Sequence, residues 1–165
     1  MVIDDFLTEV ECELVYQETL QQEYVLHSST PEREWTMLSG NHRERDYNCR
    51  NVFKYITLLS EVVGDKMVRS STNLAPPGAF FSGDLHVDDG EITALYYPHE
   101  WDIMWGGGTY FEDGTTIDYV KNRLVLYDAS TLHKALPHAS PNGWRMTLAY
   151  KTLLKWNKDE DRNSK

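Results

Sequence analysis

The sequence predicts an α+β fold, in which N-terminal helices precede an antiparallel β-sheet domain of the jelly-roll or barrel type. Two observations support this prediction. Residues 1–64 of the 165-residue chain carry two helical patterns. The chain beyond Gly64 consists of short runs rich in β-branched and aromatic residues, which Gly, Pro, Asp and Asn separate. Because no helical pattern alternates with these runs, antiparallel pairing is favoured.

Both predicted helices have start or stop signals. Thr8 and Glu11 form a capping-box pattern at the start of the first helix, and apolar residues follow at helical spacing. The second helix is predicted from an apolar stripe followed by a glycine that suits a left-handed C-cap: Val52, Ile56, Leu59, Val63 and Gly64. Residues 27–47 between the helices are polar and weakly periodic, so we expect a long loop with one short strand near residues 35–38.

The predicted strands follow in order along the rest of the chain. They are MVRSSTNLA, AFFSGDLHV, TALYYP, TYFED, RLVLYDAS and RMTLAYKTLL, with a triple-glycine turn before TYFED. The sequence contains no internal repeat and no linker. We therefore expect one catalytic domain over residues 1–155 and a charged, frayed tail over residues 156–165.

Composition excludes several classes of protein. The net charge of −10 disfavours a nucleic-acid partner, because an acidic surface repels phosphate backbones. No apolar run approaches the roughly 20 residues that span a bilayer, so no membrane association is expected. The first residues do not resemble a secretory signal, and we therefore expect a cytoplasmic location. Cys12 and Cys49 form no CxxC pattern, which excludes a cysteine-ligated zinc site.

The segment DLHVDDGE suggests a metal site. If the preceding strand continues through it, His86 and Asp88 at positions i and i+2 share one face and can bind the same ion. A third ligand is expected from another strand. The candidates are His27, His42, His99, His133 and His138. We favour His133, which follows the strand-like RLVLYDAS, over His138, which follows a proline and is expected in a loop. His99 is expected at the surface.

A buried cation is predicted beyond these histidines. On the strand RMTLAYK, Arg145, Thr147 and Ala149 share one face, so a guanidinium is combined with small side chains that leave room for a ligand. A buried arginine needs an anion, and a ligand carboxylate would supply one.

These motifs, taken in order, resemble the iron- and 2-oxoglutarate-dependent dioxygenases in their prolyl-4-hydroxylase-like branch. The similar segments are HVDD, ALYYPHEW, WGGGTYF, TLHKALP and WRMT, which lie between residues 70 and 151. The resemblance implies a double-stranded β-helix with helices packed on it. It also implies that His86, Asp88 and His133 bind Fe(II) and that Arg145 binds the distal carboxylate of 2-oxoglutarate, with hydroxyl groups from Tyr97 and Thr147.

The same resemblance implies the reaction. Two histidines and one carboxylate leave three positions of an octahedral iron open for 2-oxoglutarate and O₂. 2-Oxoglutarate would be decarboxylated to succinate and CO₂ while an unactivated C–H bond is hydroxylated, with ascorbate as a stimulant. Asp88 favours hydroxylation over halogenation, because related halogenases have Gly or Ala at that position.

Several alternatives remain open at this point. The substrate is expected to be a prolyl residue of a peptide or protein, or else a free amino acid or small metabolite. A different class is a non-catalytic jelly-roll binding module that keeps the fold without turnover. Nucleic-acid demethylation is a third class, which the net charge disfavours.

Overall fold

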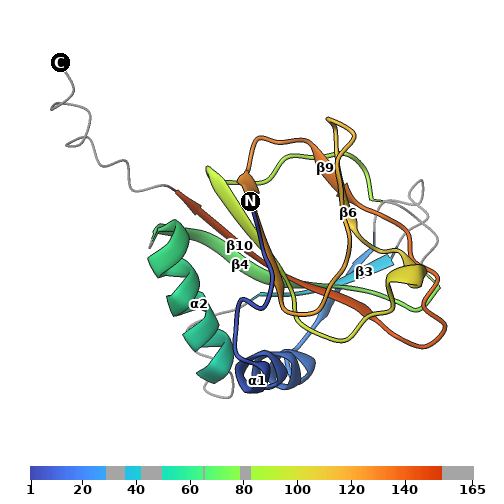
Figure 1. Ribbon diagram of the computed structural model, residues 1–165, viewed down its shortest axis with the longest axis horizontal. Coiled ribbons are helices and arrows are strands. Elements are labelled where there is room, and N and C mark those ends of the chain that lie inside the picture. Colours follow the sequence, from blue (N-terminus) through green and yellow to red (C-terminus); the bar gives the residue numbers. More distant parts are fainter. Residues whose placement is uncertain (29–35, 42–49, 65, 79–82, 154–165) are drawn as a thin grey trace, which may run out of the picture.

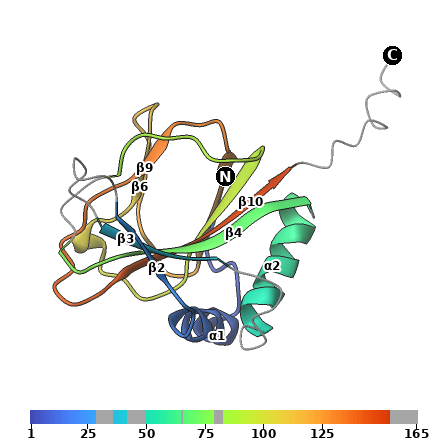
Figure 2. The ribbon, with the colours of Figure 1, turned by 180° about the vertical axis from the view of Figure 1, so that it is seen from behind.

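Ten strands, two α-helices and one short 3-10 helix make up the part of the chain that the computed structural model describes, residues 1–28, 36–41, 50–64, 66–78 and 83–153. A seven-stranded sheet has the order β1-β8-β5-β10-β4-β3-β2, and a three-stranded sheet has the order β7-β6-β9. Neighbouring strands in both sheets are antiparallel. The strands of the two sheets surround a common interior (Figure 1), which is also visible from behind (Figure 2).

The strands differ widely in length. The seven-stranded sheet contains β1 (Val2–Ile3), β8 (Arg123–Asp128), β5 (Ile92–Tyr97), β10 (Arg145–Leu153), β4 (Lys66–Ala75), β3 (Thr36–Asn41) and β2 (Val25–Ser28). The smaller sheet contains β7 (Thr116–Ile117), β6 (Thr109–Phe111) and β9 (His133–Ala135), and the 3-10 helix η1 spans Ile103–Trp105. The predicted fold of N-terminal helices and antiparallel strands is therefore confirmed.

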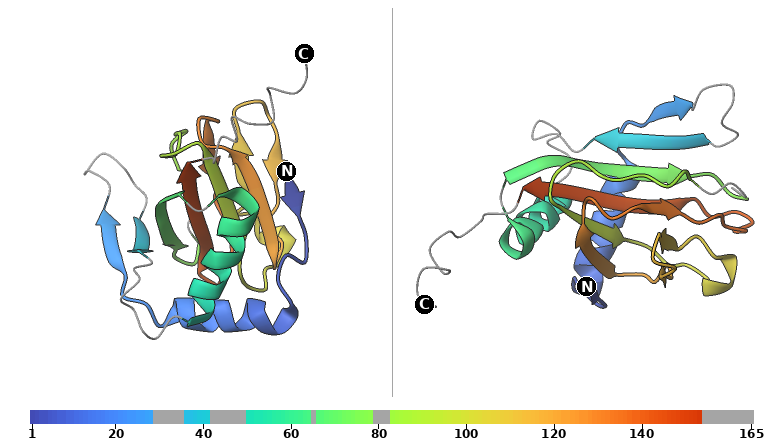
Figure 3. Two further views of the ribbon diagram at one scale, coloured as in Figure 1. Left: turned by 90° about the vertical axis from the view of Figure 1, so that its left-hand side faces the viewer. Right: turned by 90° about the horizontal axis from the view of Figure 1, so that it is seen from above.

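Both predicted helices are present. In α1 (Glu9–Leu20), the Thr8 hydroxyl accepts a hydrogen bond from the Glu11 backbone N–H, and the Glu11 carboxylate accepts one from the Thr8 N–H. Helix α2 (Arg50–Val63) is followed by Gly64 with φ +115°, a conformation that favours glycine. Both helices lie on the outer side of the seven-stranded sheet (Figures 1 and 3).

The seven-stranded sheet buries side chains on both faces, because alternate residues of a strand point in opposite directions. On β5, Tyr96 belongs to the cluster beneath the helices, whereas Tyr97 belongs to the cluster on the opposite face. On β10, Leu148 and Ala149 divide between the same two clusters. The inward-facing residues of β10 thus point into the interior between the two sheets.

The predicted loop over residues 27–47 contains the short strand expected near residues 35–38, which is β3, whereas its partner strand β2 was not predicted. Residues 29–35 and 42–49 lie outside the described part. One expectation about secondary structure was wrong. The strand predicted for AFFSGDLHV is absent over residues 83–87, where His86 forms an isolated bridge, and residues 79–82 lie outside the described part. The predicted tail, residues 156–165, also lies outside the described part. None of the helices within the described ranges is long and apolar enough to cross a membrane.

Candidate metal centre and anion site

The segment of residues 83–91 lies alongside β9 although it is not itself a strand. The backbones of His86 and His133 exchange two hydrogen bonds of 3.0 Å, and the Asp88 N–H donates to the Ala129 carbonyl at 2.8 Å. These contacts on both sides of Val87 hold the segment against the start of β9. The predicted alignment of His86 and Asp88 by a continuous strand is wrong, and backbone hydrogen bonds to the neighbouring chain orient the two side chains instead.

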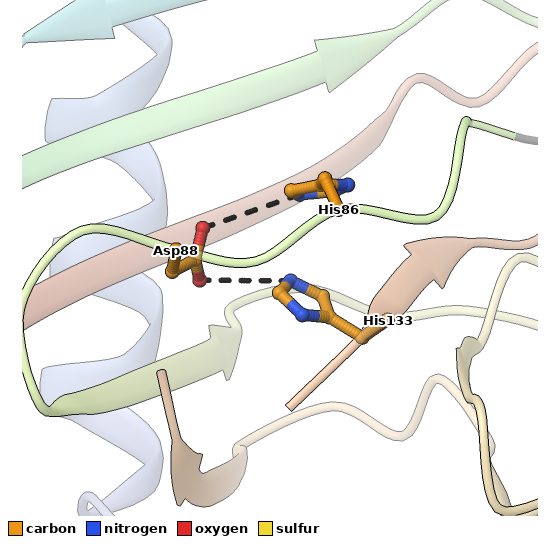
Figure 4. A group of neighbouring side chains, drawn as sticks. All are labelled: His86, Asp88 and His133. Carbon is orange, nitrogen blue, oxygen red and sulfur yellow. Dashed lines mark ion pairs between the residues drawn. The ribbon is translucent and has the colours of Figure 1, made fainter. Parts of the chain in front are cut away.

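His86, Asp88 and His133 converge on one point (Figure 4). His133 Nε2 lies 3.5 Å from Asp88 Oδ2, and His86 Nε2 lies 4.0 Å from Asp88 Oδ1. Ligand atoms of the three residues all lie within 4.8 Å of one another. Neighbouring ligands of an octahedral ion with 2.1 Å bonds are about 3 Å apart, so small side-chain movements would close the three atoms around an ion.

Contacts with backbone carbonyls determine which nitrogen of each histidine ring can bind an ion. His86 Nδ1 lies 2.8 Å from the Asp84 carbonyl, and His133 Nδ1 lies 2.9 Å from the Thr131 carbonyl. A carbonyl only accepts hydrogen bonds, so each Nδ1 carries the proton and each Nε2 keeps its lone pair for an ion. Burial lowers the pKa of His133, which also favours the neutral form.

The three side chains differ in exposure. The side chains of His133 and Asp88 are 7% and 6% exposed, whereas that of His86 is 53% exposed. The centre is thus closed on the side of the sheets and open on the side of His86.

Three donors surround the Asp88 carboxylate. Thr93 Oγ1 donates to Oδ2 at 2.8 Å, the Tyr127 hydroxyl lies 3.4 Å from the same oxygen, and the Lys151 ammonium donates to Oδ1. Burial raises the pKa of Asp88, but the hydrogen bond and charge of Lys151, together with Thr93, outweigh it and leave the pKa below its ordinary value. The carboxylate is therefore ionised near neutral pH.

Tyr127 also contacts the histidine of this group. Its hydroxyl lies 3.1 Å from His133 Nε2, and its ring packs against the rings of His133 and Phe111. Burial, followed by the charge of Asp88, raises the pKa of Tyr127 well above its ordinary value, so the phenol is neutral. Its O–H can donate to either His133 or Asp88.

Arg145 is a buried cation on the inward face of β10. The residue is 5% exposed, its Nε donates to the Gly107 carbonyl, and one terminal nitrogen lies 3.5 Å from the Gly108 carbonyl. Its guanidinium carbon lies 5.9 Å from the ring centre of Tyr119. Within the described ranges no carboxylate pairs with it, and burial lowers its pKa.

The glycine turn explains how two carbonyls reach this guanidinium. Gly107 has φ +78°, and a Cβ at that position would lie 3.2 Å from Arg145 Cδ and 3.1 Å from His138 Cβ. A Cβ at Gly108 would lie 2.4 Å from the Ile117 carbonyl oxygen. Side chains at these positions would push the turn away from Arg145, so the glycines serve close packing.

The remaining predicted site residues lie near Arg145. Tyr97 is fully buried with its hydroxyl 2.8 Å from Thr109 Oγ1, and Thr147 is 2% exposed on the same face of β10 as Arg145. His138 is buried beside Trp101 and Gly107 and does not join the group of ligand atoms. The expectation that His99 lies at the surface was wrong, because its ring is stacked on Tyr16 and is buried.

Sequence reasoning missed the groups that surround Asp88: Thr93, Tyr127 and Lys151. One signal was available. Lys151 continues the alternation of Arg145, Thr147 and Ala149 on the inward face of β10, and a lysine on a buried face requires a partner. Nothing local in the sequence could show that the partner is Asp88, which comes from a different segment.

Comparison with known proteins gives similarity of fold alone. No family model and no curated protein sequence matches the chain. A prolyl-4-hydroxylase from Pseudomonas putida matches with a TM-score of 0.69 and 19% identity, over 92% of this chain and 91% of that one. A prolyl hydroxylase from Trichoplax adhaerens, in complex with a peptide of hypoxia inducible factor, gives the same TM-score and identity over 92% and 83%.

A third solved structure has a different activity. The non-heme alpha-ketoglutarate-dependent epimerase SnoN from nogalamycin biosynthesis matches with a TM-score of 0.70 and 14% identity, over 91% of this chain and 74% of that one. All three belong to iron- and 2-oxoglutarate-dependent oxygenases, so the fold of this chain is the one used by that class of enzyme. Its arrangement of elements is prolyl-4-hydroxylase-like.

Proposed function

We propose that the protein is an Fe(II)- and 2-oxoglutarate-dependent dioxygenase that hydroxylates an unactivated C–H bond. The observation that carries the proposal is the convergence of His86, Asp88 and His133 in a fold that also buries Arg145 without a carboxylate partner among the described residues. We further propose that the two sheets form a double-stranded β-helix and that residues 1–155 constitute a single catalytic domain.

The three converging residues suit Fe(II). Two imidazole nitrogens and one carboxylate oxygen are the donor set that non-heme iron oxygenases use, and they leave open positions for other ligands. The fit rests on two features of this chain: both Nε2 atoms have their lone pairs available, and Asp88 is ionised. His86, Asp88 and His133 would therefore hold the ion.

Arg145 suits the distal carboxylate of 2-oxoglutarate. A buried guanidinium that no carboxylate among the described residues accompanies is stabilised by an anion, and its planar N–H groups match a carboxylate. Tyr97 and Thr147 would add hydroxyl donors beside it. Burial raises the pKa of Tyr97, so this phenol keeps its proton and can donate it to a carboxylate.

When bound, iron and 2-oxoglutarate supply the oxidation, in which 2-oxoglutarate and O₂ give succinate, CO₂ and the hydroxylated substrate. The chain's own residues position and insulate these reactants. Phe111 and Tyr127 pack against His133 on the inner side of the site and keep water away from the buried ligands. The open side at His86 leaves access for the C–H bond that is attacked.

The leading substrate is a prolyl residue of a peptide or protein. The prolyl hydroxylases of similar fold support this choice, and the one from Trichoplax adhaerens is bound to a peptide. A free amino acid or small metabolite is the alternative, which the likeness to the epimerase SnoN supports. Nucleic acid is not expected as a partner, because the net charge of the chain is −10.

One observation favours a second candidate, a non-catalytic binding module. The ammonium of Lys151 already neutralises the Asp88 carboxylate, so the charge of this carboxylate is balanced without any metal. A module that has lost turnover could keep its fold in this way. Arg145 argues against this candidate, since a module without a cosubstrate has no need of a buried, unpaired guanidinium.

Succinate formation tests the proposal. The purified protein is incubated with Fe(II), ascorbate and 2-oxoglutarate, with and without proline-containing peptides or metabolite mixtures, and products with one added oxygen atom are sought by mass spectrometry. Succinate above the level of the Asp88→Ala variant supports the proposal. Bound iron without any succinate, with or without substrates, would favour the binding module.

A further inference from the structure

We propose that Lys151 is an internal counter-cation of the metal centre, which stabilises Asp88 when no ion is bound and lowers the affinity of the site for divalent ions. The inference rests on the proposed metal site. It extends that proposal, because a residue that is not itself a ligand would then control how tightly the site binds a metal ion.

The position of Lys151 supports this role. Lys151 and Asp88 have side chains 8% and 6% exposed, and the ammonium donates directly to Asp88 Oδ1. Lys151 on β10 lies opposite Thr93 on the neighbouring strand β5, and Thr93 donates to the other oxygen of the same carboxylate. Two adjacent strands of the sheet thus each donate a hydrogen bond to a carboxylate that comes from a segment without regular structure.

A second cation lies beside this pair but outside the site. Arg69 on β4 lies opposite Lys151 and forms an ion pair with Asp89 at 3.3 Å. The side chains of Arg69 and Asp89 are 48% and 64% exposed. That pair is screened by solvent, whereas the pair of Lys151 and Asp88 is shielded from it. Lys151 is therefore the cation whose charge acts on an ion held by Asp88.

Two effects of Lys151 on metal binding oppose each other. The ammonium orients the carboxylate, and losing such an orienting partner typically weakens metal binding about 10- to 100-fold. The ammonium also repels the ion, because an ion bound to that carboxylate lies within about 5 Å of it, the sum of a hydrogen bond and a metal–oxygen bond. At an effective dielectric constant near 20, this repulsion corresponds to roughly four to five powers of ten in affinity before relaxation, so repulsion prevails.

The substitution Lys151→Met tests the inference, because methionine keeps the length of the side chain and removes its charge. We expect the affinity of the purified protein for Co²⁺, measured by calorimetric titration, to increase about tenfold or more, with a lower melting temperature in the absence of metal. Lys151→Arg, which keeps the charge, should retain an affinity close to that of the natural protein. Lys134→Met is the matched control, since Lys134 follows His133 but lies over the Tyr110 ring.

Each outcome decides between the possibilities. Unchanged or weaker Co²⁺ binding by folded Lys151→Met would overturn the inference and leave the proposed function standing. Absence of Co²⁺ binding in every variant, including the natural protein, would instead refute the metal site itself. If Lys151→Met folds only when Co²⁺ is present, the inference is supported, because the ion then replaces the lost cation. If it does not fold even then, Lys151→Met/Asp88→Asn should fold, and failure of this double variant would refute the neutralising role.

Discussion

Replacing Arg145 by glutamine tests the anion site most directly. Arg145 is 5% exposed, so water cannot compensate a bound carboxylate for the loss of the guanidinium. Removing one partner of a buried, hydrogen-bonded charge pair costs about 2–5 kcal/mol. Since 1.4 kcal/mol is a factor of ten, the dissociation constant of 2-oxoglutarate should rise by about 30- to 4,000-fold.

Metal binding should be almost unaffected by the same substitution. Arg145 makes its hydrogen bonds to Gly107 and Gly108 and contacts none of the three proposed ligand atoms. The protein without ligands should also keep most of its stability, because an unpaired buried guanidinium is itself costly and glutamine retains a donor for the Gly107 carbonyl.

The assay is an anaerobic calorimetric titration of the Co²⁺-loaded protein with 2-oxoglutarate, combined with melting temperatures of each variant. Arg123→Gln is the matched control, because Arg123, the first residue of β8, forms an ion pair with the exposed side chain of Asp4. A dissociation constant for Arg145→Gln within about threefold of the natural value would refute the reasoning. Lost binding together with a collapsed melting temperature would mean that the guanidinium serves the fold instead.

Four other predictions follow from the described contacts. Asp88→Ala should abolish succinate formation and weaken Co²⁺ binding, and unchanged turnover would remove Asp88 from the site. His133→Gln should lose Co²⁺ binding while His138→Gln keeps it, and the reverse result in calorimetry would exchange their roles. Asn122→Ala should destabilise the fold by about 3–5 kcal/mol in urea unfolding, because a buried side chain that bonds the Leu7 backbone and the Tyr96 hydroxyl is lost. Burial lowers the pKa of His99, so the unfolded chain binds the proton first and stability should fall as the pH drops below about 6.5; His99→Gln should reduce that slope in melting temperatures measured from pH 8 to 5.

The sequence predicted the elements whose signals are local. The capping box at Thr8 and Glu11 is satisfied within a single helical turn, and the short apolar run between Arg123 and Asp128 pairs as a strand should. Tyr96 and Tyr97 could be assigned to opposite faces for the same reason, because alternation is a property of the strand alone. Such features need no information about distant parts of the chain.

The features that were missed depend on contacts between distant segments. Residues 83–87 have a strand-like sequence, yet they contact β9 through an isolated bridge at His86 and one hydrogen bond from the Gly83 N–H to the Ala135 carbonyl, and the Asp88 N–H donates to Ala129 instead. His99 follows a strand and precedes a turn, which suggests exposure, but Tyr16 of α1 covers it. No local pattern reports that a helix more than 80 residues earlier will pack on a given turn.

The two buried cations of β10 show what distinguishes a ligand site from an internal ion pair. Arg145 and Lys151 stand on the same face, six positions apart, which is about 20 Å of strand. Burying a cation is unfavourable unless an anion accompanies it. Lys151 has its anion in Asp88, whereas no carboxylate pairs with Arg145 within the described ranges. Because a chain gains nothing for its own stability from an unpaired buried guanidinium, Arg145 is best explained by an anion that arrives from outside, and Lys151 is not a competing receptor for it.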